Sequence, residues 1–63
     1  QETKFYFEGE WYDATIFDRN KIGIGTEIPG PAIVQEMDST TVILPKHEAK
    51  VDSVGNLLIN PSN

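Results

Sequence analysis

The sequence contains no cysteine and only one histidine, His47. Without cysteine, no disulfide can stabilise the fold and no Cys-based zinc site can form. His47 stands among ten Asp and Glu residues, which makes it a poor nucleus for a structural metal. Stability therefore has to come from hydrophobic packing, and 38% of the residues are apolar.

Basic residues are also scarce, and long apolar runs are missing. The sequence has five Lys and Arg residues and ten Asp and Glu residues, which gives a net charge of −5. This balance argues against nucleic acid and against anionic membrane surfaces as partners, because both are bound mainly through Lys and Arg. The apolar runs are only three residues long, as in residues 32–34, whereas a membrane span needs about 20. No charged, apolar-cored leader is visible, so we expect no signal peptide and a cytoplasmic location.

Sixty-three residues allow one domain with a thin core. For so short a chain, apolar burial and conformational entropy nearly cancel. Two alternatives remain open. The fold depends for its stability on a partner or on the rest of a longer protein, or it is a mini-barrel that is stable alone. It begins with Gln1 rather than Met. We therefore expect residues 1–63 to be a single β-domain that is a processed chain or an excised fragment of a larger protein.

Residues 30–45 read GPAIVQEMDSTTVILP and contain two short, largely β-branched runs, 32–34 and 42–44. Such runs, bounded by Pro, Gly, Asp and Ser, are typical of strands joined by a tight connection. Proline cannot donate to a strand ladder, so the prolines at both ends delimit the pair. This stretch is predicted to be the central hairpin.

Further strands are predicted at 4–8, 11–17, 48–52 and 57–60. No segment has the i, i+3, i+4 periodicity of an amphipathic helix. The aromatic residues of the first two strands are expected to lie in the core rather than to form a ligand platform. Neither face of the strand at 11–17 is cleanly polar, which suits a strand covered on both sides or a strand at a contact surface. In the strand at 48–52, Ala49 and Val51 are expected to face inward. The predicted fold is all-β, a small barrel or sandwich of about six short, mainly antiparallel strands.

Several connections carry local signals. Gly9-Glu10 is predicted to form a type II′ turn, which has glycine at its first central position. Asp18 is predicted to cap a single helical turn. Gly23 and Gly25 are interpreted as a bent connection, because neither a full dinucleotide fingerprint nor a P-loop Lys follows them. Residues 61–63 are expected to be a frayed tail.

No residue is assigned a catalytic, cofactor-binding or metal-binding role. His47 titrates near neutrality but lacks an orienting partner by spacing, so we expect an exposed turn histidine. Ser39, Thr40 and Thr41 lack a nearby base and a G-x-S-x-G elbow. Their hydroxyls are interpreted as turn chemistry. The acidic residues are scattered and are interpreted as solvated faces and edge-strand guards.

A freestanding binding module or a biotinyl- or lipoyl-like carrier is the alternative function. Such carriers present a modified lysine at a hairpin tip. Lys46 follows a proline at a predicted turn. Lys50 lies in residues 48–51, which weakly resemble a biotin-acceptor motif. The methionines that should flank an acceptor lysine are absent, since Ala49 and Val51 flank Lys50.

A set of short motifs runs through nearly the whole chain. Its elements are Trp11, a D-x-x-[IVL]-[FY]-D-R segment at 13–19, Gly25, G-P-A-I-V-x-E at 30–36, D-S-T-T at 38–41, a strand ending in proline at 42–45, and V-D-x-x-G-N-L at 51–57. In this set the sequence resembles the C-terminal end of the hydantoinase A/5-oxoprolinase family, which includes acetone and acetophenone carboxylase-type subunits. Members often carry a glycine where Lys46 follows Pro45. The resemblance implies that residues 1–63 are a C-terminal fragment of a larger protein.

The resemblance implies a non-catalytic module of an ATP-dependent cyclic-amide hydrolase or carboxylase subunit. In such proteins ATP and a divalent metal are handled outside this segment, so no cofactor is expected within it. The expected partner is the rest of the parent chain or a partner subunit, contacted through interdomain or intersubunit packing. The fragment alone is not expected to be an enzyme.

Overall fold

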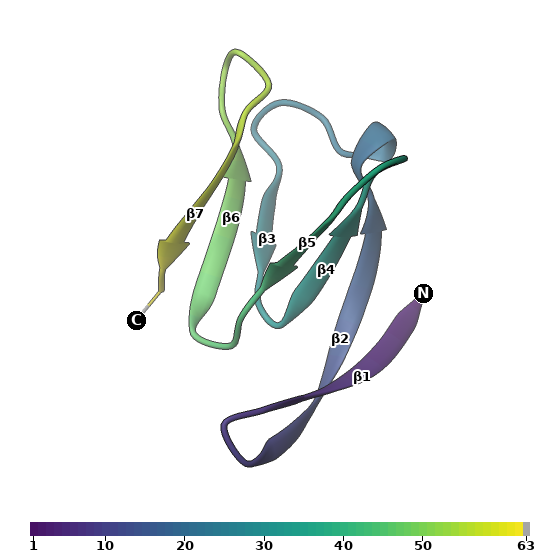
Figure 1. The fold of residues 1–63 in the computed structure, drawn as a ribbon. Helices are drawn as coiled ribbons and strands as arrows, with labels where there is room; N and C mark the ends of the chain where they lie inside the picture. The colour runs from purple at the N-terminus through teal and green to yellow at the C-terminus, as the bar shows by residue number, and fades with distance from the viewer. Residues whose placement is uncertain (63) are drawn as a thin grey trace.

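The chain forms two small, open β-sheets (Figure 1). The computed structural model describes residues 1–62. Their strands are β1 (Glu2–Phe7), β2 (Glu10–Asp18), β3 (Glu27–Pro29), β4 (Ala32–Gln35), β5 (Thr40–Ile43), β6 (His47–Val51) and β7 (Leu57–Pro61). The first sheet has the order β1-β2-β4-β5 and the second the order β3-β6-β7. The expected all-β fold is confirmed as a sandwich-like pair of sheets. The alternative of a closed barrel is wrong, because each sheet ends in two edge strands.

One strand pair is parallel, whereas the other strand pairs are antiparallel. β2 and β4 run parallel, with Thr15 opposite Ala32 and Asp18 opposite Gln35. A parallel pair needs a crossover, and here the chain passes through a 3-10 turn, η1 (Arg19–Lys21), and through β3 of the other sheet. The Asp18 side chain caps η1 as predicted, since its Oδ1 accepts the Asn20 N–H at 3.0 Å. No helix within residues 1–62 has the length and apolar content needed to cross a membrane.

The core lies where the two sheets face each other. Its buried cluster comprises Ile28, Ala32, Val34, Ile43 and Ala49, which come from β3, β4, β5 and β6. Side chains alternate between the two faces of a strand, which places both Ala32 and Val34 of β4 inward. Ala49 and Val51 are buried, as predicted. Four strands therefore supply a core of only a few small or β-branched side chains.

The central hairpin of residues 30–45 is confirmed. β4 and β5 pair antiparallel from Ala32 opposite Ile43 to Gln35 opposite Thr40. Its turn is closed between backbone groups, since the Glu36 N–H donates to the Ser39 carbonyl at 2.8 Å. At the other end, the Gly30 N–H donates to the His47 carbonyl at 2.8 Å, which ties this hairpin to β6.

The predicted type II′ turn at Gly9-Glu10 is wrong by one residue. Phe7 pairs with Glu10, so the central residues are Glu8 and Gly9, and both have positive φ, 49° and 81°. Positive φ at both positions is the geometry of a type I′ turn, which prefers glycine at the second position. Glu8, expected to end a strand, is instead the first turn residue.

The frayed tail was predicted to begin at residue 61, but residue 61 still belongs to a strand. β7 continues through Pro61, which pairs with His47. The Ser62 N–H donates to the Lys46 carbonyl at 2.8 Å, so residue 62 is also held against the start of β6. Asn63, the last residue of the predicted tail, lies outside the described residues.

Candidate functional site

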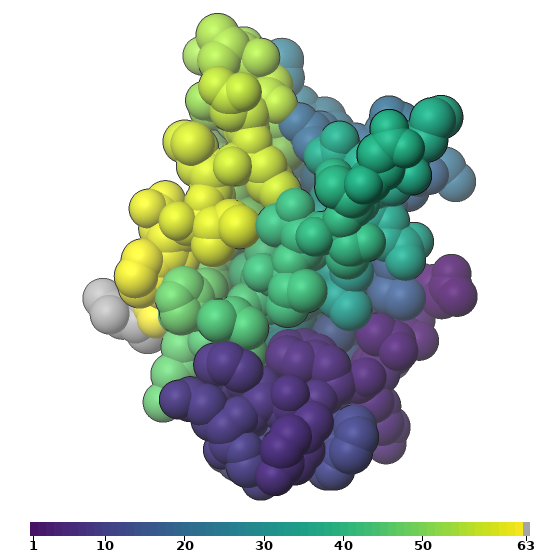
Figure 2. All heavy atoms as spheres, viewed as in Figure 1, coloured from purple at the N-terminus to yellow at the C-terminus, as the bar shows by residue number. Residues whose placement is uncertain are grey.

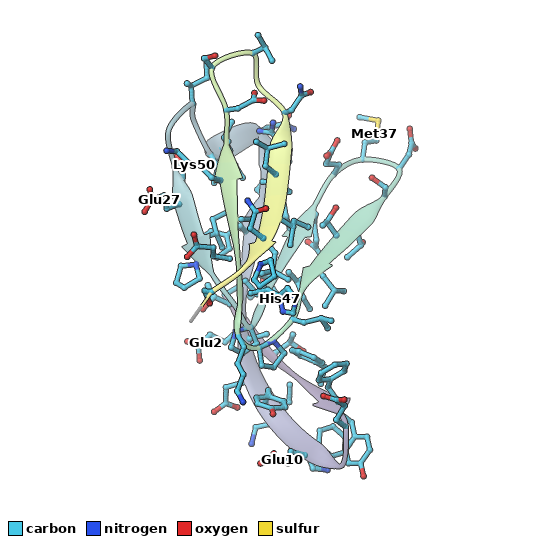
Figure 3. The ribbon with its side chains drawn as sticks, turned by 90° about the vertical axis from the view of Figure 1, so that its left-hand side faces the viewer. Glu2, Glu10, Glu27, Met37, His47 and Lys50 are labelled. Atoms are coloured by element: carbon cyan, nitrogen blue, oxygen red, sulfur yellow. The ribbon has the colours of Figure 1, made fainter. Side chains whose placement is uncertain are left out.

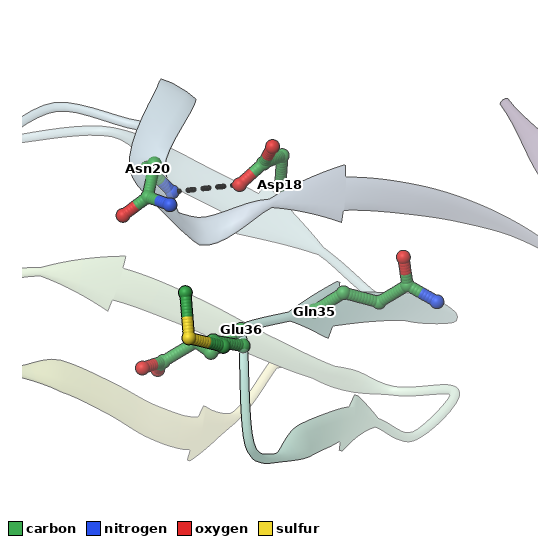
Figure 4. A pocket seen from close by; sticks show the side chains of 5 residues that line it. Asp18, Asn20, Gln35 and Glu36 are labelled. Atoms are coloured by element: carbon green, nitrogen blue, oxygen red, sulfur yellow. Dashed lines mark hydrogen bonds between the residues drawn. The ribbon is translucent and has the colours of Figure 1, made fainter.

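A shallow hollow of about 310 Å³ lies between η1 and the β4–β5 turn (Figure 4). Its lining residues are Asp18, Asn20, Gln35, Glu36 and Met37. The Asp18 carboxylate already caps η1 (Figure 4). Met37 is 95% exposed, so its side chain gives the hollow little enclosure. The hollow brings together no nucleophile with an oriented base.

The candidate nucleophiles and His47 lie at opposite ends of β5. Ser39 immediately precedes this strand and Thr40 begins it, whereas His47 follows it after a short link. Figure 3 shows the β4–β5 turn, marked by Met37, well apart from His47. His47 is half-buried at the start of β6, with its Nδ1 3.1 Å from the Pro45 carbonyl oxygen. The expectation of an exposed turn histidine is therefore wrong, because His47 is half-buried and is the first residue of a strand.

The two lysines considered for a carrier role occupy different settings. Lys46 lies in the β5–β6 link with a φ of 65° and an exposed side chain. Lys50 lies within β6, the middle strand of its sheet, and its Nζ is 3.9 Å from Glu27 Oε2 on β3 (Figure 3). Only Lys46 is placed at a turn. Within residues 1–62, no three His, Cys, Asp or Glu side chains gather as metal ligands would.

The polar residues of two separate sequence motifs form one structural cluster. The Arg19 guanidinium donates to the Gly55 carbonyl, 36 residues away in sequence, and to the Ile22 carbonyl at 3.5 Å. Asp52 Oδ1 accepts the N–H groups of Val54 at 3.0 Å and Asn56 at 2.8 Å. These bonds close the β6–β7 turn and fasten it to η1. The sequence motifs at 13–19 and 51–57 were the only available signal for this contact.

Comparisons with known proteins agree with these motifs. The model of the hydantoinase/oxoprolinase C-terminal domain matches residues 1–58. The chain belongs to this family. It is 41% identical over 56 residues to 5-oxoprolinase 1 of Arabidopsis thaliana and 38% identical over 48 residues to 5-oxoprolinase of Saccharomyces cerevisiae. It is 45% identical over 56 residues to an uncharacterized protein of Methanocaldococcus jannaschii. No solved structure matches this chain.

This C-terminal domain is much shorter than the relatives that it matches. The alignments cover 89% of the chain but 4% of the Arabidopsis protein and 8% of the archaeal one. For the yeast protein the figures are 76% of the chain and 4% of the relative. The resemblance noted from the motifs is confirmed, and it concerns one small part of each longer relative.

The Asp52 turn should make the stability of the hydantoinase/oxoprolinase C-terminal domain sensitive to acid. The Asn56 N–H lowers the pKa of the Asp52 carboxyl, which outweighs the opposing effect of partial burial. The ionised form thus contributes stability above the unfolded pKa of about 3.9, and this contribution is lost as the pH falls through the lower folded pKa. We expect the unfolding temperature of the wild type to fall over this range more steeply than that of Asp52→Asn, which cannot titrate. Parallel curves for the two proteins would contradict this role.

Apolar side chains remain exposed at several places on the domain. The large apolar residues that are exposed are Tyr6, Trp11, Ile24, Met37, Val42, Val54, Leu58 and Ile59. The expectation that the aromatic residues lie in the core is wrong for Tyr6 and Trp11, which are 59% and 70% exposed. The reason is geometric: this part of β2 pairs only with β1, while β4 pairs with the later residues 15–18.

Proposed function

We propose that this domain is a non-catalytic packing module of a longer protein, held against the rest of the parent chain or against a partner subunit. The observation that carries the proposal is the number of large apolar side chains exposed on so small a domain. Exposed apolar patches on soluble proteins commonly mark interaction sites. Burying these side chains against a larger body would also supplement the thin core.

The family motifs support a structural rather than a catalytic role for this segment. Arg19 holds the β6–β7 turn, Asp52 closes it, and the Gly30 N–H ties the β3–β4 link to β6. Each of these groups is engaged with the backbone of the domain itself. These residues of the family motifs therefore help to build the module.

The parent protein is, in this proposal, an ATP-dependent hydrolase of a cyclic amide or a related carboxylase subunit. Two of the similar proteins carry the name 5-oxoprolinase, which is the basis for a cyclic-amide substrate. ATP and a divalent metal would be bound outside residues 1–63. We place the parent protein in the cytoplasm.

Hydrogen–deuterium exchange tests the packing role. The exchange of residues 1–63 is compared between the longer polypeptide and the same residues produced alone. We expect backbone amides of the β1–β2 hairpin to exchange at least tenfold more slowly in the longer polypeptide, because contacts outside the domain cover it. Equal exchange rates in the two samples would contradict a packing role.

Two measurements on residues 1–63 alone test the competing functions. We expect no ATP-dependent hydrolysis of 5-oxoproline or hydantoin, and turnover by this segment would overturn its non-catalytic assignment. We also expect an unmodified intact mass from a host that biotinylates and lipoylates proteins. An added mass on Lys46 or Lys50 would favour the carrier function instead.

A further inference from the structure

The β1–β2 hairpin projects beyond the two-sheet body. Figure 2 shows its first residues (purple) as a separate lobe at one end of the molecule, and Figure 1 shows the hairpin turn reaching past the other strands. Within residues 1–62, β1 is an edge strand that pairs with β2 alone. The end of the hairpin thus presents one of its faces freely to a partner.

The outer face of this hairpin is centred on two aromatic rings. Tyr6 and Trp11 are directly opposite in the ladder, and their ring centroids lie 5.3 Å apart at 65° in an edge-to-face arrangement. On the opposite face of the hairpin, Phe5 and Tyr12 stack at 5.8 Å and are half-buried. This second pair stiffens the hairpin, so Tyr6 and Trp11 have little conformational freedom left to lose on binding.

Negative charge surrounds the aromatic pair. Residues 2–13 contain four carboxylates and one ammonium group. That ammonium, on Lys4, already lies 3.8 Å from Asp13 Oδ1. Glu8 lies in the turn beside the aromatic pair, and Glu2 and Asp13 lie on the same face of the ladder as Tyr6 and Trp11. Glu10 lies on the opposite face, where its Oε2 accepts a hydrogen bond from the Tyr12 hydroxyl at 3.5 Å. Loss of hydration through partial burial raises the pKa of Tyr12, and the negative charges of Glu10 and Glu8 raise it further.

We infer that the outer face of the β1–β2 hairpin, centred on Tyr6 and Trp11, docks onto an apolar surface that bears Arg or Lys elsewhere in the same longer protein. This inference rests on the proposed packing function and names the face and the chemistry of its partner. Tyr, Trp and Arg are the residues that most often dominate interface energies. An Arg side chain can stack on Trp11 and also bind a flanking carboxylate.

A second copy of this domain fits the same face poorly. Self-association through Tyr6 and Trp11 would bring the Glu2, Glu8 and Asp13 carboxylates of two copies together, and like charges across an interface oppose binding. A basic surface instead neutralises them. The charge pattern therefore selects a different surface of the longer protein over a second hairpin.

Site-specific photo-cross-linking in the longer polypeptide tests this inference. Benzoylphenylalanine replaces Trp11, which is 70% exposed and tolerates another large aromatic. A matched position is Ile24, which is 68% exposed and lies in the segment between η1 and β3, at the opposite end of the domain (Figure 1). Leu58 on β7 is the third position. Cross-linked peptides are identified by mass spectrometry.

We expect the Trp11 probe to cross-link to a peptide outside residues 1–63 that contains Arg or Lys. Reversing two charges beside this face, with Glu2→Lys and Glu8→Lys together, should lower this yield at least fivefold. An unchanged yield, a peptide without Arg or Lys, or a cross-link to the hairpin of a second copy would each overturn the inference. If the Trp11 probe is silent while Ile24 or Leu58 cross-links, the packing function stands and the hairpin assignment falls. If all three positions are silent, both fall.

Discussion

Gly30→Ala is expected to destabilise the domain by about 3 kcal/mol, the upper end of the usual range for overpacking. A Cβ at this position would lie 2.9 Å from the His47 carbonyl oxygen and closer still to that of Leu44. Both obstacles are backbone atoms, which cannot rotate away as a flexible side chain would. Moving them would also disturb the bond from the Gly30 N–H to the His47 carbonyl.

A loss of this size is a large share of the stability available to so short a chain. Urea unfolding followed by far-UV circular dichroism measures it. Gly23→Ala is the matched control, because a Cβ there meets nothing within 4 Å and the backbone is not left-handed. We expect the midpoint of the control to stay near that of the wild type. If the two variants lose the same stability, the close approach at Gly30 does not explain the glycine.

The strand at 48–52 and the hairpin at 30–45 were predictable because their signals are local. Alternation placed Ala49 and Val51 inward, and proline marked the ends of the hairpin. The cap at Asp18 was likewise predictable from its position ahead of a short polar segment. In each case the residues that form the structure are neighbours in the chain.

The errors and omissions concern information that is not local. The parallel pairing of β2 with β4 joins segments that are separated by η1 and β3, and no residue pattern along either strand encodes a partner. The contact of Arg19 with Gly55 spans 36 residues and could be suspected only from the family motifs. Neither ladder partners nor cross-chain hydrogen bonds can be deduced from periodicity.

The position of the aromatic residues shows a second limit. Alternation separates Tyr6 from Phe5 and Phe7, but it cannot tell which of the two faces is covered. Coverage depends on how far the second sheet extends over the first, and that sheet leaves the end of the hairpin free. The same uncertainty applies to the turn, because both Glu8-Gly9 and Gly9-Glu10 place a glycine in a two-residue loop. Register decided between them, and register is set by the whole ladder.

Ile43→Ala should cost about 3 kcal/mol, within the usual range for truncating a buried isoleucine. Ile43 has no exposed surface and belongs to the cluster that also contains Ile28, Val34 and Ala49. Its neighbours come from β3, β4 and β6, so they are held by both sheets. A cavity at this point cannot collapse without moving the two sheets together. The loss of stability should therefore include the cost of the cavity as well as the lost transfer free energy of the removed methyl and methylene groups.

Val42→Ala provides the control on the same strand. Val42 is adjacent in sequence, is also β-branched, and points to the opposite face, where it is 44% exposed. We expect it to lose less than about 1 kcal/mol, mostly from the weaker β-propensity of alanine. Urea unfolding of both variants therefore separates burial from propensity on one strand. Equal losses would mean that the space between the sheets is not the main source of stability. In the longer polypeptide, the loss for Val42→Ala should grow only if the outer face of β5 is covered there as well.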